Sequence, residues 1–314
     1  MKILLIALAA LVLLTGGLYL WNRSLARDAE ARFPPLGRFA EVEGLRLHYL
    51  EAGAGRPVVL LHGANGALQD FTATVFDRLA ARYRVIAIDR PGHGYSERPT
   101  QEVATPAVQA RLVRGLLRER GVERPLLVGF SWSGSLVLSY AVQHQAEIAG
   151  VVMLAGAAYE WPSPIDAKWR LPTWPVVGDL FVNTLSLVLG LRVADAGVAA
   201  AFAPEAVSPS YADAPLPLAL RPASFHANAE DVRTMKPALR EQSKRYAELA
   251  LPIVILVGDG DTVVSPSIHS RQLHAAAANS ELIVLPGAGH LLPYTRPDAV
   301  IDAIDRAMMK TVTP

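Results

Sequence analysis

The chain has 314 residues, of which 51% are hydrophobic, and its formal net charge at pH 7 is +1. This length suits one large α/β domain with an insertion or two small domains. The near-neutral charge gives no indication of a nucleic acid or an acidic polymer as partner. The absence of cysteine excludes disulfides, thiolate metal sites and cysteine nucleophiles.

The N-terminus carries an apolar run long enough to cross a membrane. Residues 3–20 contain no charged side chain, and a helix of this length spans roughly 27 Å, close to the hydrocarbon thickness of a bilayer. Tyr19 and Trp21 lie where an interfacial aromatic belt would fall. A signal peptide, the alternative, would have a shorter apolar run and a small-x-small cleavage site. The sequence therefore predicts an uncleaved anchor over residues 1–22.

The charges that flank this run favour opposite orientations. Arg23, Arg27 and Arg32 favour a cytoplasmic location for the rest of the chain, whereas Lys2 before the run favours its export. We expect the exported side, periplasmic or extracellular. A linker is predicted over residues 23–37.

Strand-like and helix-like segments alternate after the linker. Residues 39–43 and 45–50 alternate in hydrophobicity around a Glu43-Gly44 turn and predict two antiparallel strands. Continuous apolar runs, typical of buried parallel strands, occupy residues 57–61, 83–88, 125–128, 150–154, 252–257 and 282–285. Helices are predicted over residues 73–81, 106–120, 266–278 and 297–309. This order predicts an α/β fold: a mostly parallel eight-stranded sheet with helices on both faces.

The alternation stops in residues 157–248. This segment has helix-like pieces and several prolines but no strand-like run, which predicts a helical cap inserted into a core formed by residues 38–156 and 249–314. Residues 180–191 are nearly uncharged; they either contact a bilayer beside the anchor or form a buried cap helix. The aromatic cap residues either line a pocket or pack the cap; they are Trp161, Trp169, Trp174, Phe181 and Phe202.

A serine occupies a predicted strand-to-helix turn, Gly129-Phe130-Ser131-Trp132-Ser133-Gly134. Such a turn raises the serine side chain above the sheet and directs the first N–H groups of the helix at a ligand. Gly129 provides the small residue needed where strand and helix nearly touch, but Ser133 replaces the last glycine of the G-x-S-x-G pattern. Ser133 is a rival nucleophile, although its place in the first helical turn favours a local bond to the backbone. A plain turn with a helix N-cap is the alternative interpretation.

A serine hydroxyl becomes a nucleophile when a base lies within hydrogen-bond reach and a carboxylate orients that base. Functional groups of parallel α/β sheets gather in loops after the strands. Two such loops contain Asp261 and His290, and these predict the acid and the base. Asp259, in the same loop as Asp261, and Glu160, after the sixth strand, remain alternative acids. His62 and His93 are flanked by glycine, and a structural role is expected for both.

An acyl-transfer intermediate needs two backbone N–H donors for its oxyanion. We predict these donors at Trp132, which follows the serine, and at Ala64, in the loop after the third strand. The predicted substrate pocket contains Asn65, Phe130 and Trp161.

The set formed by His62-Gly63, residues 89–96, the Ser131 turn, Asp261 and Gly289-His290 resembles the α/β-hydrolase superfamily, over residues 39–309. The order serine, acid, histidine is that of the family. The resemblance is closest to cap-bearing esterases, haloperoxidase-like enzymes and C–C hydrolases of ring-fission products. Haloalkane dehalogenases and epoxide hydrolases share much of the pattern but use aspartate at the turn, so Ser131 argues against both.

This resemblance implies a serine hydrolase that needs no metal or organic cofactor. Ser131 would form an acyl-enzyme with a small, apolar acyl or ester substrate, His290 would transfer the proton and Asp261 would hold the imidazole. A C–C bond hydrolase and a cofactor-free perhydrolase are alternative activities. A non-catalytic binding module on the same fold is the alternative of a different class.

Overall fold

A computed structural model describes residues 1–311 of the protein, so the last three residues of the predicted core segment 249–314 lie outside it. Within the described residues, eight strands form one sheet in the order β1-β2-β4-β3-β5-β6-β7-β8. The strands are β1 (Arg38–Val42), β2 (Leu45–Ala52), β3 (Pro57–Leu61), β4 (Arg84–Ile88), β5 (Leu126–Phe130), β6 (Gly150–Leu154), β7 (Ile253–Gly258) and β8 (Ser280–Leu285).

The sheet is mixed, with its antiparallel part at one edge. Strand β2 pairs antiparallel with both β1 and β4, whereas β3 to β8 pair in parallel. The prediction of a mostly parallel eight-stranded sheet with an antiparallel pair of first strands is confirmed. Strands β5, β6 and β7 are buried throughout, as their continuous apolar runs require.

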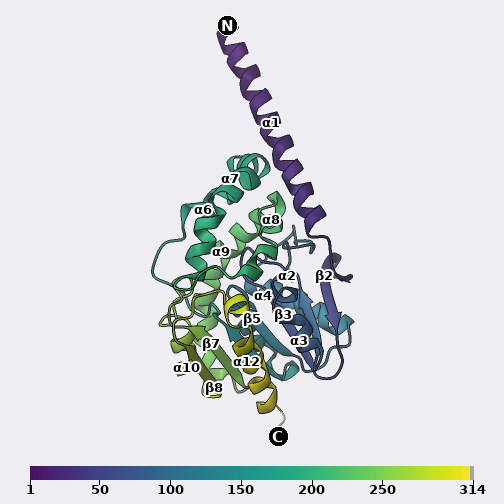
Figure 1. Ribbon diagram of the computed structural model, residues 1–314, viewed down its shortest axis with the longest axis vertical. Helices are drawn as coiled ribbons and strands as arrows, with labels where there is room; N and C mark the ends of the chain where they lie inside the picture. The colour runs from purple at the N-terminus through teal and green to yellow at the C-terminus, as the bar shows by residue number, and fades with distance from the viewer. Residues whose placement is uncertain (312–314) are drawn as a thin grey trace.

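Helices cover both faces of the sheet (Figure 1). On one face, α4 (Pro106–Glu119), α5 (Ser133–His144) and α10 (Ser270–Ala276) share one core cluster with the strands. On the other face, α2 (Gln69–Thr72), α3 (Phe76–Ala80), α11 (Leu292–Thr295) and α12 (Pro297–Lys310) share the second. Helix α4 begins as predicted, because Thr105 accepts a hydrogen bond from the Val108 N–H and Pro106 occupies the first turn.

Two helix predictions are wrong in extent. The helix predicted over 73–81 is shorter, since only α3 lies in that range and α2 ends before it, at Thr72. The hydroxyl groups of Thr72 and Thr74 donate to the nearby carbonyls of Gln69 and Asp70, and such bonds compete with a continuous helix from α2 to α3. The helix predicted over 266–278 is only α10, which begins at Ser270 and ends at Ala276.

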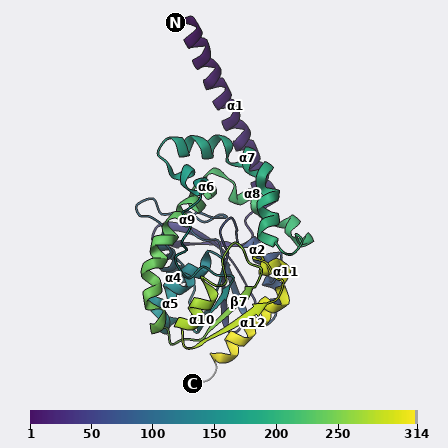
Figure 2. The ribbon, with the colours of Figure 1, turned by 90° about the vertical axis from the view of Figure 1, so that its left-hand side faces the viewer.

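Residues 157–248 form helices between the sheet and the N-terminal helix (Figures 1 and 2). They are α6 (Ala167–Arg170), α7 (Val177–Phe202), α8 (Leu216–Ala219) and α9 (Pro222–Gln242), with short 3-10 turns between and after them. This segment of the described chain contributes no strand to the sheet.

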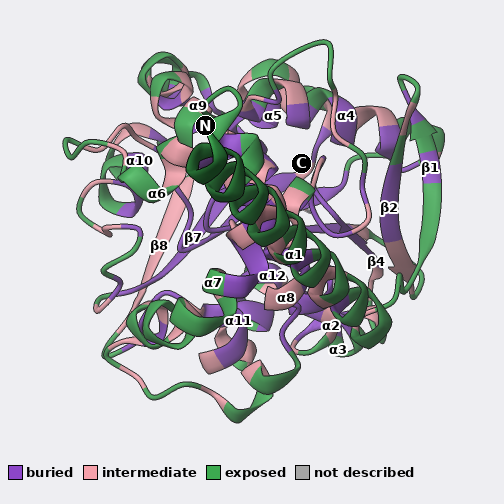
Figure 3. Ribbon diagram, turned by 90° about the horizontal axis from the view of Figure 1, so that it is seen from above, coloured by how far each residue is buried: buried purple, intermediate pink, exposed green. Residues whose placement is uncertain are grey.

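The N-terminal helix α1 (Lys2–Arg32) is longer than the predicted anchor. Residues 23–32, expected in the linker, continue the helix, and only residues 33–37 connect it to β1. The reason is that this second part of α1 packs against α7 and α8 of the cap, and such packing stabilises a helix beyond its intrinsic propensity. The apolar first part projects beyond the cap and is exposed (Figures 2 and 3).

Candidate active site

Ser131 lies on a sharp turn between β5 and α5. Its φ is +53°, a left-handed conformation that is uncommon for a residue other than glycine and is typical of functional turns. The turn is held by two backbone bonds, from the Ser131 N–H to the Leu154 carbonyl (2.9 Å) and from the Ala157 N–H to the Ser131 carbonyl (3.0 Å). A Cβ at Gly129 would lie 2.5 Å from the Ser133 carbonyl oxygen, so only glycine permits this approach.

Ser133 does not bond locally, contrary to the sequence-based expectation. Its hydroxyl is fully buried and donates to the backbone carbonyl of His62, at 2.5 Å. Strands β3 and β5 are hydrogen-bonded neighbours, and their pairing brings this distant carbonyl within reach of the first turn of α5. The Ser133 hydroxyl is thereby committed to the loop after β3.

Ser131, His290 and Asp261 form a hydrogen-bonded series. The Oγ of Ser131 lies 2.9 Å from the Nε2 of His290, and the Nδ1 of His290 lies 2.7 Å from the Oδ2 of Asp261. All three residues are buried. The other carboxylate oxygen of Asp261 accepts the N–H groups of Val263 (2.8 Å) and Val264 (2.9 Å), which fixes the plane of the carboxylate. This arrangement can move a proton from the serine to the imidazole.

The two alternative acids lie apart from His290. Asp259 is exposed, and its carboxylate accepts the Gly287 N–H at 2.7 Å. Glu160 forms an ion pair with Arg240 at 2.5 Å. Among the three carboxylates considered, the structure brings only Asp261 into contact with His290.

The predicted oxyanion donors belong to segments that meet at Ser131. A Cβ at Gly63 would lie 2.9 Å from the Ser131 Cβ, so the loop after β3 comes as close as a glycine allows. Within residues 1–311, the backbone N–H groups of Ala64 and Trp132 donate to no protein acceptor. These N–H groups therefore remain available to an oxygen atom of a ligand.

The three predicted pocket residues have different surroundings. The Phe130 ring lies 5.3 Å from the His290 ring. Asn65 exchanges two hydrogen bonds of 2.9 Å with Asn228 of α9, which ties the loop after β3 to the cap. Trp161 instead packs against the α4–α5 face of the core, with the Lys236 ammonium 5.4 Å from its ring centre.

A buried ion pair under the turn was not predicted from the sequence. Arg90 is completely buried; its guanidinium contacts Asp231 of α9 at 2.5 Å and donates to the carbonyls of His62 and Gly63, both at 3.1 Å. It also lies 4.1 Å from the centre of the Trp132 indole, whose N–H donates to the Asp231 carbonyl at 3.1 Å. The ion pair therefore connects the cap to both segments that carry the predicted oxyanion donors, the loop after β3 and the start of α5. Residues 89–96 include Arg90 as part of the family pattern, but no sequence signal indicated Asp231.

Burial lowers the pKa of three histidines outside the Ser131 series, His62, His93 and His269. Burial, and next the Arg90 charge, hold the pKa of His62 well below its usual value, and its Nε2 accepts the Arg90 N–H at 3.0 Å. Burial, and next the Arg90 charge, also hold the pKa of His93 well below its usual value. Burial also lowers the pKa of His269 to about 4, and its Nδ1 accepts the N–H groups of Ala158 and Tyr159. All three rings bond to the backbone of loops that follow the parallel strands β3, β4 and β6.

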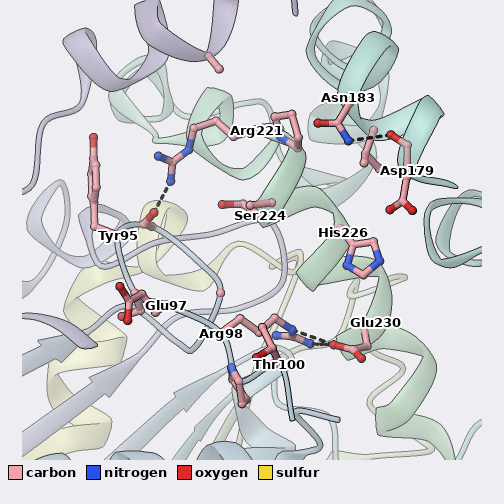
Figure 4. A pocket seen from close by; sticks show the side chains of 18 of the residues that line it. Tyr95, Glu97, Arg98, Thr100, Asp179, Asn183, Arg221, Ser224, His226 and Glu230 are labelled. Carbon is pink, nitrogen blue, oxygen red and sulfur yellow. Dashed lines mark hydrogen bonds and ion pairs between the residues drawn. The ribbon is translucent and has the colours of Figure 1, made fainter. Parts of the chain in front are cut away.

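The structure contains a cavity of about 1130 Å³, part of whose lining is shown in Figure 4. It is bordered by α1, residues 92–103, α7 and α9, and ion pairs such as Arg98–Glu230 (2.5 Å) line its wall. None of Ser131, Asp261 and His290 lines it. Among residues 1–311, no group of three or more histidines, cysteines or carboxylates is placed to hold a metal ion.

Comparison with known proteins agrees with this architecture. The chain is 28% identical to an uncharacterized protein of Mycobacterium tuberculosis over 88% of this chain and 82% of that one. It is 24% identical to the 2-hydroxy-6-oxo-6-phenylhexa-2,4-dienoate hydrolase of Burkholderia cepacia, over 82% and 89% of the two chains. Among solved structures, the esterase of Thermogutta terrifontis superposes with a TM-score of 0.71 at 21% identity, covering 88% of this chain and all of that one.

The family model for the alpha/beta hydrolase fold matches residues 56–297. This range runs from the start of β3 to the start of α12, and it includes the Ser131 turn, the cap and the loops of Asp261 and His290. The chain belongs to the α/β-hydrolase fold family.

Proposed function

We propose that the protein is a serine hydrolase that cleaves a carboxylic ester or a related acyl substrate through an acyl-enzyme on Ser131. The observation that carries the proposal is the hydrogen-bonded series from the Ser131 Oγ through His290 to Asp261. A serine alkoxide attacks a carbonyl carbon, and a base at 2.9 Å can take its proton as the bond forms.

In the proposed reaction, Ser131 attacks the substrate carbonyl while the Nε2 of His290 takes the hydroxyl proton. The resulting oxyanion accepts the N–H groups of Ala64 and Trp132. The imidazolium is stabilised by Asp261 and gives its proton to the leaving group, which departs as the acyl-enzyme forms. Water then attacks the acyl-enzyme, with His290 as base, and releases Ser131 and the acid product.

A second candidate activity is the hydrolysis of a C–C bond in a ring-fission product. It is favoured by the similarity to the Burkholderia cepacia hydrolase and to the 2-hydroxymuconate semialdehyde hydrolase of a Pseudomonas species, 31% identical over 45% of this chain and 52% of that one. A cofactor-free perhydrolase and a non-catalytic binding module would use the same fold. The contacts around Ser131 favour a catalytic role over the binding module.

Labelling with a fluorophosphonate probe tests the nucleophile. The wild-type protein and Ser133→Ala should be labelled, with the adduct located on Ser131 by mass spectrometry, and Ser131→Ala should not be labelled. The reason is that only the Ser131 hydroxyl contacts a base, whereas the Ser133 hydroxyl donates to the His62 carbonyl. A folded wild-type protein that takes no label, or an adduct on Ser133, would contradict the proposal.

A comparison of substrates separates ester from C–C hydrolysis. We expect kcat/KM for p-nitrophenyl acyl esters to exceed that for a dienoic ring-fission ketone, because the proposed pathway breaks a C–O bond, and an oxygen leaving group accepts the bonding electron pair more readily than a carbon does. Both substrates should be measured with the wild-type protein and with Ser131→Ala as the blank. A preference of the wild-type protein for the ketone would replace the ester assignment by the C–C assignment.

We also propose that α1 anchors the protein in a membrane, with the hydrolase domain on the exported side. Support comes from the length and apolar composition of α1, whose most apolar part contains no buried residue. Helix α7 is also long and apolar enough to cross a membrane, but it is partly buried and lies in the cap.

A further inference from the structure

The N-terminal helix is joined to the cap by one buried asparagine. The side-chain amide of Asn22 in α1 donates to the carbonyls of Val182 and Asn183 in α7, both at 3.1 Å. Its oxygen accepts the Leu187 N–H at 2.9 Å. In an uninterrupted helix, that N–H would bond to the Asn183 carbonyl. Asn22 thus bonds to the Asn183 carbonyl and the Leu187 N–H, which lie one turn apart on α7, and it is fully buried there.

This junction fixes where the apolar part of α1 leaves the cap. Trp21 lies beside α7, with the Arg192 guanidinium 5.9 Å from its ring centre. Apart from Asn22, the buried residue of α1 is Ala29, farther along the helix. The first part of α1 projects beyond α7 (Figures 1 and 2). If this part crosses a bilayer, the membrane surface lies at the level of α7.

Exposed apolar residues lie just before α7 and in its first turn. Trp174, Val176, Val177 and Leu180 expose 51%, 77%, 53% and 53% of their surface; we call these four residues the cap edge. The surface of a soluble protein rarely exposes four large apolar side chains so close together. A tryptophan among them suits the boundary between water and lipid.

We propose that the cap edge inserts into the interfacial layer of the same bilayer that α1 crosses. Asn22 joins α7 to α1 where the apolar run ends. The proposed anchoring through α1, on which this inference rests, therefore places the start of α7 at the membrane surface. Its exposed apolar side chains then leave water for the acyl boundary, as in helices that lie on membranes. This surface is independent of the proposed reaction at Ser131.

The absence of cysteine permits an unambiguous test in the full-length protein. Val177→Cys and Leu180→Cys are labelled with an NBD fluorophore, and Met309→Cys is the control. Met309 is also apolar and is 65% exposed. It lies on α12, near the C-terminus, at the far end of the molecule from α1 (Figure 1). Each protein is reconstituted in phosphatidylcholine–phosphatidylglycerol vesicles with and without doxyl lipids. Labels at 177 and 180 should be quenched by doxyl lipid and roughly tenfold less accessible to aqueous iodide than the label at 309.

Asn22→Leu is the second variant, because it removes the bonds to α7 but leaves the apolar run unchanged. In this background, doxyl quenching at 177 should fall several-fold, while the protein resists alkaline extraction from the vesicles and still reacts with fluorophosphonate. Three outcomes would overturn the proposal. The first is iodide access at 177 and 180 equal to that at 309, and the second is release of the wild-type protein by alkali. The third is protection from iodide without quenching by doxyl lipid, which would indicate that a protein partner, such as a second copy, covers the cap edge.

Discussion

Asp261→Asn is expected to lower kcat for ester hydrolysis by about 10⁴-fold without unfolding the protein. The N–H groups of Val263 and Val264 both require an oxygen at the Oδ1 position. An asparagine would satisfy them with its carbonyl oxygen and would turn its NH₂ group towards the Nδ1 of His290. That nitrogen must then accept, so the proton moves to Nε2, and the imidazole can no longer take the proton of Ser131.

The measurement is kcat and kcat/KM with a p-nitrophenyl acyl ester, together with a thermal unfolding curve for each variant. Asp259→Asn and Glu160→Gln are the matched controls, since neither carboxylate contacts His290, and their rates should stay within about threefold of wild type. If Asp259→Asn lost as much activity as Asp261→Asn, the assignment of the acid would be wrong.

Asp231→Ala is expected to cost about 3–5 kcal/mol of unfolding free energy, the usual result of breaking a buried ion pair. The substitution leaves the Arg90 guanidinium, completely buried, without its carboxylate partner. It also removes the acceptor at 2.8 Å for Arg98 and for the amide of Gln109. The loss of these contacts should loosen the loop after β3, because Arg90 holds the carbonyls of His62 and Gly63.

Urea unfolding of the full-length protein in detergent micelles measures this loss. Glu230→Ala is the control, because Glu230 precedes Asp231 on α9 and pairs with Arg98 at a partly exposed site; its cost should be about 1 kcal/mol or less. A further variant, Arg90→Met with Asp231→Leu, should recover much of the stability, since no unpaired charge remains. Equal costs for Asp231→Ala and Glu230→Ala would refute the expectation.

The sequence predicted the sheet well because buried parallel strands have local patterns. Strands β3 and β6 begin and end at the predicted residues, 57–61 and 150–154, since each is a short apolar run bounded by polar or turn-forming residues. The helix predicted over 73–81 begins later, at Phe76, for an equally local reason. Thr72 and Thr74 offer the backbone competing hydrogen bonds.

The contacts that were not predicted from the sequence join residues that are far apart in the chain. Arg90 contacts a residue 141 positions later, and Asn22 contacts one 160 positions later. Neither Asp231 nor Asn22 differs in its local pattern from an ordinary polar residue of an exposed helix face. Ser133 shows the same limit, because its acceptor, the His62 carbonyl, lies near it only after β3 and β5 have paired.

The asparagine in α1 also bears on how such a protein could evolve. A membrane anchor is commonly an exchangeable module, since any sufficiently apolar helix will hold a domain at a bilayer. Here, exchange of α1 for another anchor would leave the carbonyls of Val182 and Asn183 and the Leu187 N–H without their present partner. Anchor and cap are therefore expected to be inherited together. Among related chains, substitutions at residue 22 should be accompanied by substitutions in the first half of α7.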